Sequence, residues 1–451
     1  MSHNPGLSAW DARWIDVLLV VMVMFAVLPS GFSWREVDDA AVIAEGSVEF
    51  KLQWGSLFAL SIYVAYRHMA LAVDYLRSVN PFLLLMLAVA FAGVVWSPVP
   101  ETTLKKVVQF AGLIVFSLAV HTDGKPWVHW IKMLQLALVA IMLASVVAAI
   151  GFPSLGIDSY FGYAWRGVLS GKNTLGGTAA LSVILWPALW RHGGLSRAKL
   201  WSGLGLSVLC VVMSTSSTAM TIMALGLVVY GLLGWQHVRS TLWLLRLIVV
   251  MGMVLLLSAF LFYVAEARFP ERTEVLEPFA NLFGKSADLT GRSDIWAPLA
   301  IETEKHWLLG IGYGAFWLGP GSASQPILDS LPWIPYQAHN GYLDLLNELG
   351  AVGATLFAGL LLWHVHELLQ MLRFDRTGAA VFAAIQATLL VSNMTESALF
   401  RGVTFQFCLF TLVCVSTSAA LRRHQLQHLL TEFRVTPTRQ PAAALGSGRG
   451  S

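Results

Sequence analysis

The sequence predicts an all-α integral membrane protein of about twelve transmembrane helices. Hydrophobic residues fill 56% of the 451 positions and charged residues only 12%, which is about half the charged share of an average soluble domain. The apolar residues also stand in blocks near the roughly 20 residues that a helix needs to cross a hydrocarbon core. A water-soluble fold could not bury so much apolar surface.

Apolar blocks occur on both sides of one long polar segment. Those before it lie near Ile15–Pro29, Trp54–Tyr66, Pro81–Trp96, Val107–Val120, Val128–Ile150, Leu175–Trp190, Leu200–Met213, Ala219–Trp235 and Leu242–Val264. Those after it lie near Tyr342–Leu362, Ala379–Asn393 and Val403–Ala420. The predicted domains are 1–264 with helices 1 to 9, a periplasmic loop subdomain over 265–341, 342–421 with helices 10 to 12, and a basic cytoplasmic tail over 422–451. We expect the last six residues of the tail, Gly-Ser-Gly-Arg-Gly-Ser, to take no part in the folded structure.

Lysine and arginine in short loops indicate which face of a membrane protein is cytoplasmic. With a cytoplasmic N-terminus, the inner loops carry Arg67, Arg77, Lys125, Arg191, Arg197, Lys199, Arg239, Arg373, Arg376 and the tail from Arg422. Both termini are then predicted to be cytoplasmic. The acidic first loop and the segment 265–341 lie outside. Loops of this length are usually functional or disordered, and the aromatic residues and a helix expected over Ile295–Leu309 favour an ordered one.

Several cations break this pattern and fall on the outer face. They are Lys105, Lys106, Arg166, Lys172, Arg268, Arg272, Arg292 and Arg401. Arginine binds phosphate through a rigid fork and lysine binds it as a point charge, so the group suits a lipid-linked phosphate or pyrophosphate. Arg268 and Arg272 are flanked by glutamates, and exposed ion pairs are an equal alternative there. Arg166 has no acid close by after Asp158, which favours a phosphate.

Two glycine-rich segments resemble nucleotide motifs only weakly. Gly167–Thr174 has one residue too few between its glycines for a P-loop, and Asn173 stands where Ser or Thr should follow the lysine. Gly310–Gly314 lacks the strand and the ribose-binding acid of a dinucleotide fingerprint, so we expect it to shape a turn. The three cysteines lie inside apolar blocks without zinc or disulfide spacing. No cofactor, metal site or nucleic-acid partner is predicted.

His339 ends the long outer segment, where Asn340-Gly-Tyr-Leu begins a new span. A histidine titrates near neutral pH and can act as a general base at a membrane surface. On position alone, the favoured interpretation is a histidine that forms a hydrogen bond at a helix start, beside Asn340 as N-cap. Both interpretations place the side chain at the outer membrane face.

Other polar residues inside the apolar blocks have mixed interpretations. Glu396, with Asn393, sits at the outer end of its span, and an ionisable residue at such depth is a functional candidate by default. The cluster Ser214–Thr218 is expected to mark a short outer turn. His364 and His366 lie near the cytoplasmic end of a span, where a solvated helix face is favoured over a metal pair.

Four short motifs, in order, resemble the O-antigen ligase and polymerase superfamily. They are Arg166-Gly with Gly171-Lys-Asn-Thr-Leu-Gly176, Gly291-Arg-Ser-Asp-Ile-Trp296, Leu309-Gly-Ile-Gly-Tyr-Gly314, and His339-Asn-Gly-Tyr-Leu with Glu348-Leu-Gly350. Each is short, but their order, with the long outer loop before the His-Asn pair, is fairly specific and spans most of the chain. The resemblance implies a GT-C-like fold and makes His339 the leading catalytic candidate.

The resemblance also implies an activity. Such an enzyme takes a glycan from undecaprenyl pyrophosphate and attaches it to a sugar hydroxyl of the lipid A core of lipopolysaccharide. It works at the periplasmic face of a Gram-negative inner membrane, without metal or nucleotide sugar. His339 would remove the proton of the acceptor hydroxyl in a single inverting displacement. The pyrophosphate is assigned to Arg166 and Arg292 with Lys172, and less strongly to Arg268, Lys105 and Lys106. The supporting residues are Asn340, Tyr342 and Glu396.

Three alternatives remain open. A polymerase would extend the glycan on its own lipid carrier, and a protein O-oligosaccharyltransferase would move it to serine or threonine, both with the same donor. A twelve-span transporter would match the helix count, but carriers place their polar sites near the midplane between two similar halves. Here the notable residues gather at one face. Sequence spacing also leaves a covalent glycosyl intermediate open.

Overall fold

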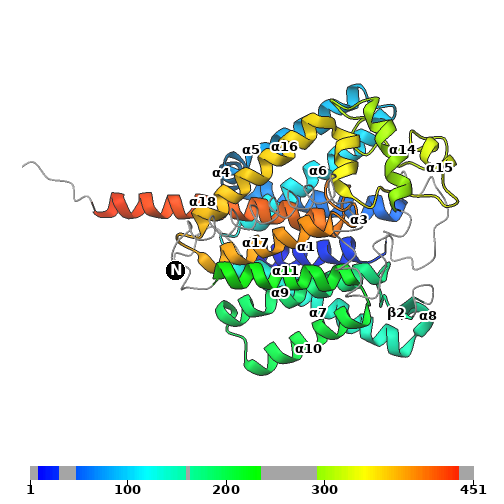
Figure 1. Ribbon diagram of the computed structural model, residues 1–451. Coiled ribbons are helices and arrows are strands. Elements are labelled where there is room, and N and C mark those ends of the chain that lie inside the picture. Colours follow the sequence, from blue (N-terminus) through cyan, green and yellow to red (C-terminus); the bar gives the residue numbers. More distant parts are fainter. Residues whose placement is uncertain (1–8, 30–46, 159–162, 235–291, 436–451) are drawn as a thin grey trace, which may run out of the picture.

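The computed structural model describes residues 9–29, 47–158, 163–234 and 292–435, and almost all of them are helical (Figure 1). The first half contains α1 (Ala9–Val27), α3 (Val48–Arg67), α4 (Met69–Ser78), α5 (Pro81–Ala92), the 3₁₀ turn η2 (Gly93–Val95), α6 (Pro100–His121), α7 (Trp127–Gly151) and α8 (Pro153–Gly156). A two-residue antiparallel pair follows, β1 (Ile157–Asp158) with β2 (Ala164–Trp165). The remaining helices are α9 (Lys172–Gly193), α10 (Arg197–Met213), α11 (Ser217–Gly234), α14 (Arg292–Glu304), α15 (Gln325–Asp329), α16 (Gly341–Met371), α17 (Arg376–Ser392) and α18 (Phe405–Val435).

The all-α membrane class is confirmed by the lengths and apolarity of these helices. Every predicted span overlaps a described helix except Leu242–Val264, which lies outside the described residues. Five described helices, α6, α7, α11, α16 and α18, are long and apolar enough to cross a membrane, or six if α3 and α4, bent by 102°, form one span. Two shorter apolar helices cover Pro81–Val95 and Arg376–Ser392.

The loops gather at two ends of the helix bundle. At one end Arg423 donates a hydrogen bond to the carbonyl of Lys125 (2.6 Å), and Trp127 donates to a carboxylate oxygen of Asp375 (2.5 Å). The lysine and arginine pattern assigns these loops to a common face, and we call this the basic end. In Figure 1, α18 projects to the left beyond the other helices, while α8, β2, α14 and α15 lie on the right. We call the second group, with His339, the site end.

Aromatic packing joins α6, α16 and α18 close to the site end. The ring of Phe400, in the loop before α18, lies 5.6 Å from that of Phe110 and 5.5 Å from that of Phe357, both edge to face. It also lies 4.8 Å from the ring of Phe407. Such pairs contribute roughly 0.5–1.5 kcal/mol each beyond the area that they bury. The loop that carries Arg401 is therefore fixed on a buried aromatic cluster.

Helix α16 is broken at Gly350, whose φ of 65° and ψ of −168° are non-helical. The segment 307–312 supplies the main-chain partners that the break removes: Ile311 N to Asn347 O, Gly312 N to Glu348 O, Ala351 N to Trp307 O and Val352 N to Leu308 O. A Cβ atom on Gly310 would lie 2.3 Å from the carbonyl of Glu348, and one on Gly350 would lie 2.3 Å from the carbonyl of Leu308. The motifs Leu309–Gly314 and Glu348–Gly350 are thus packed against each other through main-chain hydrogen bonds. The turn predicted over Gly310–Gly314 is confirmed by positive φ angles at its three glycines.

A small second core orders the segment in front of α16. The helix predicted over Ile295–Leu309 is present as α14, which ends at Glu304. The core consists of Ile295, Leu299, Phe316, Trp317, Ile327 and Ala338. Trp296 donates to the carbonyl of Ala338 (2.8 Å), so the chain is anchored directly before His339.

One interpretation of the sequence is wrong. His364 was expected on a solvated helix face, but its side chain is 1% exposed. It stands four residues from Leu360 and from Leu368, both buried, and residues at this spacing share one face of a helix. His366, by contrast, is exposed and forms a hydrogen bond with Gln370 (2.9 Å).

Candidate active site

His339 stands at the start of α16 in a left-handed backbone conformation, with φ 51°. Asn340 is the N-cap, as the sequence predicts: its side-chain oxygen accepts from the main-chain N–H groups of Tyr342 (3.1 Å) and Leu343 (3.4 Å). A left-handed residue other than glycine costs of order 1–3 kcal/mol, and such strain often marks a functional site. The cap therefore fixes the direction in which the imidazole of His339 points.

The start of α16 is also fixed to α17 and the turn that follows it. Gly341 N donates to the carbonyl of Asn393 (2.8 Å), and the Tyr342 hydroxyl donates to the carbonyl of Leu390 (2.7 Å). A Cβ atom on Gly341 would lie 2.1 Å from the side-chain oxygen of Asn393, so only glycine fits there. In the Asn-Gly-Tyr motif, the asparagine caps α16, the glycine allows Asn393 to approach closely, and the tyrosine hydroxyl attaches the helix start to α17.

Glu396 lies in the turn between α17 and α18 and contacts His339 directly. Its Oε2 is 3.1 Å from Nδ1 of His339 and accepts from Nε2 of Gln337 at 3.1 Å. Its Oε1 accepts from Nδ2 of Asn173 at 3.2 Å, and Oδ1 of Asn173 accepts from the hydroxyl of Ser216 at 3.0 Å. The predicted outer turn at Ser214–Thr218 is present between α10 and α11. The segments that carry Asn173 and Gln337–His339 therefore converge on one carboxylate, and Ser216 joins them through Asn173.

This pairing suits His339 for proton transfer. A carboxylate at Nδ1 holds the proton on that nitrogen and leaves Nε2 as the free base. The same logic orients the histidine of a Ser-His-Asp triad. The side chains of His339 and Glu396 are 24% and 29% exposed, so a substrate hydroxyl can reach them from outside.

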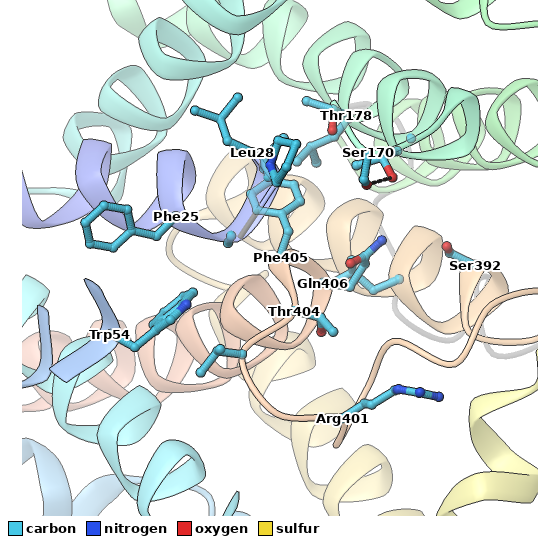
Figure 2. A pocket seen from close by; sticks show the side chains of 18 of the residues that line it. Phe25, Leu28, Trp54, Ser170, Thr178, Ser392, Arg401, Thr404, Phe405 and Gln406 are labelled. Atoms are coloured by element: carbon cyan, nitrogen blue, oxygen red, sulfur yellow. Dashed lines mark hydrogen bonds between the residues drawn. The ribbon is translucent and has the colours of Figure 1, made fainter. Parts of the chain in front are cut away.

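A cavity of about 360 Å³ lies at the site end, and Arg401 is part of its lining (Figure 2). Its apolar wall comes from the end of α1 and the start of α3, and includes Phe25, Leu28, Phe50 and Trp54. Its polar wall includes Ser170, Thr174, Thr178, Ser392, Thr404 and Gln406. Figure 2 shows Phe25 and Trp54 on one side and Arg401, Gln406 and Ser392 on another. Two cations, Lys106 and Arg401, complete the lining.

The two cations are held by the site-end loops. Arg401 lies 3.5 Å from Oε1 of Gln337 and 3.5 Å from a carboxylate oxygen of Asp344, and it also donates to the carbonyl of Tyr336. Lys106 passes Gly314, where an added Cβ atom would lie 2.6 Å from its Cγ. The absence of a side chain at Gly314 thus makes room for the lysine.

Lys106 and Arg401 also line a smaller cavity of about 150 Å³, together with Tyr313 and Glu348. Oε2 of Glu348 accepts from the N–H of Gly314 (2.8 Å). Burial raises the pKa of the Tyr313 phenol, so its hydroxyl stays protonated at neutral pH. Lys106 and Arg401 therefore border both the larger and the smaller cavity.

The cations singled out from the sequence have other surroundings. Arg166 donates to the carbonyls of Leu155 (2.9 Å) and Ser154 (3.4 Å) and so holds α8, and Lys105 forms an exposed ion pair with Glu101 (2.8 Å). Lys172 opens α9 beside Asn173. Arg292 opens α14, while its side chain, like Arg268 and Arg272, lies outside the described residues. Arg166, Lys105 and Lys172 line neither of these two cavities, nor a third site-end cavity of about 250 Å³ that is bordered by Glu396.

The structure brings His339, Asn340, Tyr342 and Glu396 together and adds residues that received a weaker role or none from the sequence. The additions are Lys106, Asn173, Gln337, Glu348 and Arg401. Asn173 and Glu348 belong to two of the four motifs, so the sequence already indicated that they could be functional. Lys106 and Arg401 were counted among the outer cations, but nothing in the sequence separates them from Arg166.

Comparison with known proteins finds one family over part of the chain. The sequence model of the O-antigen ligase family matches residues 202–358, a stretch that includes the second core and His339. Over this stretch the chain is similar to the O-antigen ligase family. It is also similar to the exopolysaccharide production protein ExoQ of Rhizobium meliloti, with 24% identity over 366 residues, 77% of this chain and 80% of that protein. The resemblance drawn from the motifs is confirmed. Members of this ligase and polymerase group are glycosyltransferase-like enzymes, so the superfamily favours an enzyme over a transporter.

Proposed function

We propose that this protein is a lipid-linked-oligosaccharide-dependent glycosyltransferase that acts as an O-antigen ligase. It transfers a glycan from undecaprenyl pyrophosphate to a sugar hydroxyl of the lipid A core. The pairing of His339 with Glu396, together with a cavity at the same end of the bundle that is apolar on one side and cationic on another, supports this most strongly. That combination suits a substrate with a prenyl tail, a diphosphate and a sugar.

The transfer is a single displacement. Nε2 of His339 takes the proton as the acceptor hydroxyl attacks the anomeric carbon, and a new carbon–oxygen bond forms there. The bond from the anomeric carbon to the diphosphate breaks, and its electron pair stays on the phosphate oxygen. Because the diphosphate leaves as a stable anion, it needs cations around it more than a proton donor. Glu396 stabilises the imidazolium that forms.

We assign the diphosphate first to Lys106 and Arg401, since both line the main cavity. Arg292, Arg268, Lys172 and Lys105 stay predictions for the same role. Arg166 ranks below Lys106 and Arg401 because it lines none of the site-end cavities among the described residues. In this proposal the Phe25 and Trp54 side of the cavity faces the prenyl chain.

We place the site end at the periplasmic face of a Gram-negative inner membrane and the basic end in the cytoplasm. Both substrates are anchored in that membrane, so an active site at its outer face meets the two polar heads. The twelve-span, GT-C-like architecture belongs to this proposal, as do the loop subdomain over 265–341 and the absence of a metal or cofactor from the reaction.

An O-antigen-type polymerase is the second candidate, favoured by the similarity to a protein of exopolysaccharide production. Donor and chemistry would be the same, but the accepting hydroxyl would belong to a second lipid-linked glycan. The His339–Glu396 pair serves either acceptor.

One assay separates the two candidates. The purified protein in lipid nanodiscs receives labelled lipid-linked glycan and rough lipopolysaccharide, without ATP or nucleotide sugars. A ligase moves the label onto lipopolysaccharide, whereas a polymerase lengthens the glycan on its own lipid. Label that stays on unchanged donor would contradict both. The His339→Ala variant, checked for insertion into the membrane, should form neither product.

A further inference from the structure

A second cavity, of about 250 Å³, lies on the His339 side of the main one, and its chemistry is different. Its polar lining consists of Asn173, Thr174, Ser216, Thr218, Gln337, Ser392, Glu396, Ser397, Thr404 and Gln406. Gly177, Ala219, Ile222 and Ala398 complete it. Among these described residues there is no lysine, arginine or aromatic side chain. Amides, hydroxyls and one carboxylate suit a neutral ligand that is rich in hydroxyl groups.

This polar cavity adjoins the cationic one. The two share Thr174, Gly177, Ile222, Ser392, Thr404 and Gln406. A ligand that runs through both places an anionic group near Lys106 and Arg401 and a neutral, hydroxylated group near Glu396. The two groups must be covalently joined close to the shared residues, which include Thr404 and Gln406.

Ser397 and Gln406 are among the polar lining residues whose side chains have no hydrogen-bond partner in the described part of the chain. The hydroxyl of Ser397 is buried without a hydrogen bond, in a residue that is 5% exposed. The side-chain amide of Gln406, which borders both cavities, forms no hydrogen bond within the described part of the chain. A buried polar group without a partner is costly, and ligand hydroxyls would satisfy it. Asn173 and Gln337, in contrast, are already engaged with Glu396.

We propose that the polar cavity binds the sugar that is joined directly to the diphosphate of the donor, with Gln406 and Ser397 as the residues that recognise its hydroxyls. This inference rests on the proposed function. The donor sugar is favoured over the acceptor because only the donor sugar is covalently continuous with a diphosphate. The bond that breaks in the transfer then lies where the two cavities meet. Glu396, which is hydrogen-bonded to His339, borders the sugar.

The test compares two ligands on the full-length protein in nanodiscs. One is undecaprenyl pyrophosphate, and the other is the same lipid carrying one N-acetylglucosamine. We expect the glycosylated lipid to bind about three- to tenfold more tightly, the effect of one or two neutral hydrogen bonds. Gln406→Ala and Ser397→Ala should each lower this ratio about threefold or more, and change the dissociation constant of the bare lipid less than about twofold.

Controls separate this inference from the function on which it rests. Gln370→Ala, at a partly buried glutamine that lines none of the site-end cavities, should leave both dissociation constants unchanged. Lys106→Gln should weaken both ligands by the same factor. Equal binding of the two lipids by the wild type, or an unchanged ratio in both variants, would overturn the sugar site while donor binding stands. Failure of the wild type to bind either lipid would overturn the proposed function as well.

Discussion

The two ends of the helix bundle use their cations in different ways. At the basic end, cations join helices: Arg422 forms an ion pair with Asp74 (2.5 Å), Lys125 lies 3.3 Å from carboxylate oxygens of Asp16 and Asp123, and Arg376 donates to the carbonyl of Leu233 (2.7 Å). At the site end, Lys106 and Arg401 line cavities. Arg166 follows the pattern of the basic end although it lies at the site end, because its guanidinium is bound to main-chain carbonyls.

This contrast shows that the face on which a cation lies does not decide its role. The partners of its side chain do. A cation that bridges two helices contributes to the fold, and its loss affects stability first. A cation that borders a cavity next to an acid–base pair contributes to binding, and its loss affects substrate affinity first. Removal of a cation should therefore lower the melting temperature at the basic end and weaken substrate binding at the site end.

The largest expected effect is that of His339→Ala. Removal of a general base lowers the turnover number by typically 10²–10⁴-fold, so glycan transfer at saturating donor should fall by about that factor. His129→Ala is the matched control at the basic end, where His129 bonds with Asp16 (2.5 Å). It should keep the rate within about threefold. Initial rates in nanodiscs measure both, and equal losses in the two variants would abolish the contrast between the ends.

The next effect concerns the cavity cations. Lys106→Gln and Arg401→Gln should each raise the KM for the lipid-linked donor about tenfold or more, because a hydrogen bond to a charged group contributes roughly 1.5–3 kcal/mol. Arg376→Gln should lower the melting temperature without raising the KM. Steady-state kinetics and thermal unfolding of the three variants test the contrast. A KM that rises as much in Arg376→Gln as in Lys106→Gln would contradict it.

A smaller effect is expected from the helix break that supports the site end. Gly350→Ala forces a left-handed conformation on alanine, at a cost of about 1–3 kcal/mol, and its Cβ atom would collide with the carbonyl of Leu308. The melting temperature should fall. Gly205→Ala is the matched control, because an added Cβ atom there has no neighbour within 4 Å. An unchanged melting temperature in Gly350→Ala would mean that the helix break and its hydrogen bonds to the segment 307–312 do not stabilise the fold.

The smallest effect is expected for Asp74→Asn, which removes the ion pair with Arg422 at the basic end. The two side chains are 25% and 33% exposed, and pairs of this kind contribute about 0–1 kcal/mol. Thermal unfolding should shift slightly, with transfer activity unchanged. A loss of activity without a loss of stability would show that the basic end takes part in the reaction.

Much of the fold could be predicted because apolar blocks are local. Each block near 20 residues long indicates its own helix, and the glycines of Gly310–Gly314 indicate a turn without knowledge of its partner. The breaks were harder to predict. Gly350 ends one half of α16 only because the segment 307–312 takes over its hydrogen bonds, and a helical pattern continues through that position in the sequence.

The candidate site could be predicted in part. The sequence singled out His339 and Glu396 separately, but they are 57 positions apart and nothing local indicates their contact. Arg166 and Arg401 look alike as outer arginines. What separates them is their surroundings, the carbonyls of Ser154 and Leu155 in one case and two cavities in the other. Partners that are distant in sequence decide such roles, and composition does not record them.

The most direct test of the active-site assignment is the coupling of donor cleavage to glycan transfer. Wild-type protein in nanodiscs, given labelled lipid-linked glycan and rough lipopolysaccharide, should release one undecaprenyl pyrophosphate for each glycan transferred. His129→Ala should match it, and His339→Ala should release almost none. Release at the same rate from His339→Ala, or transfer without release of undecaprenyl pyrophosphate, would contradict an active site built on His339 at the site end.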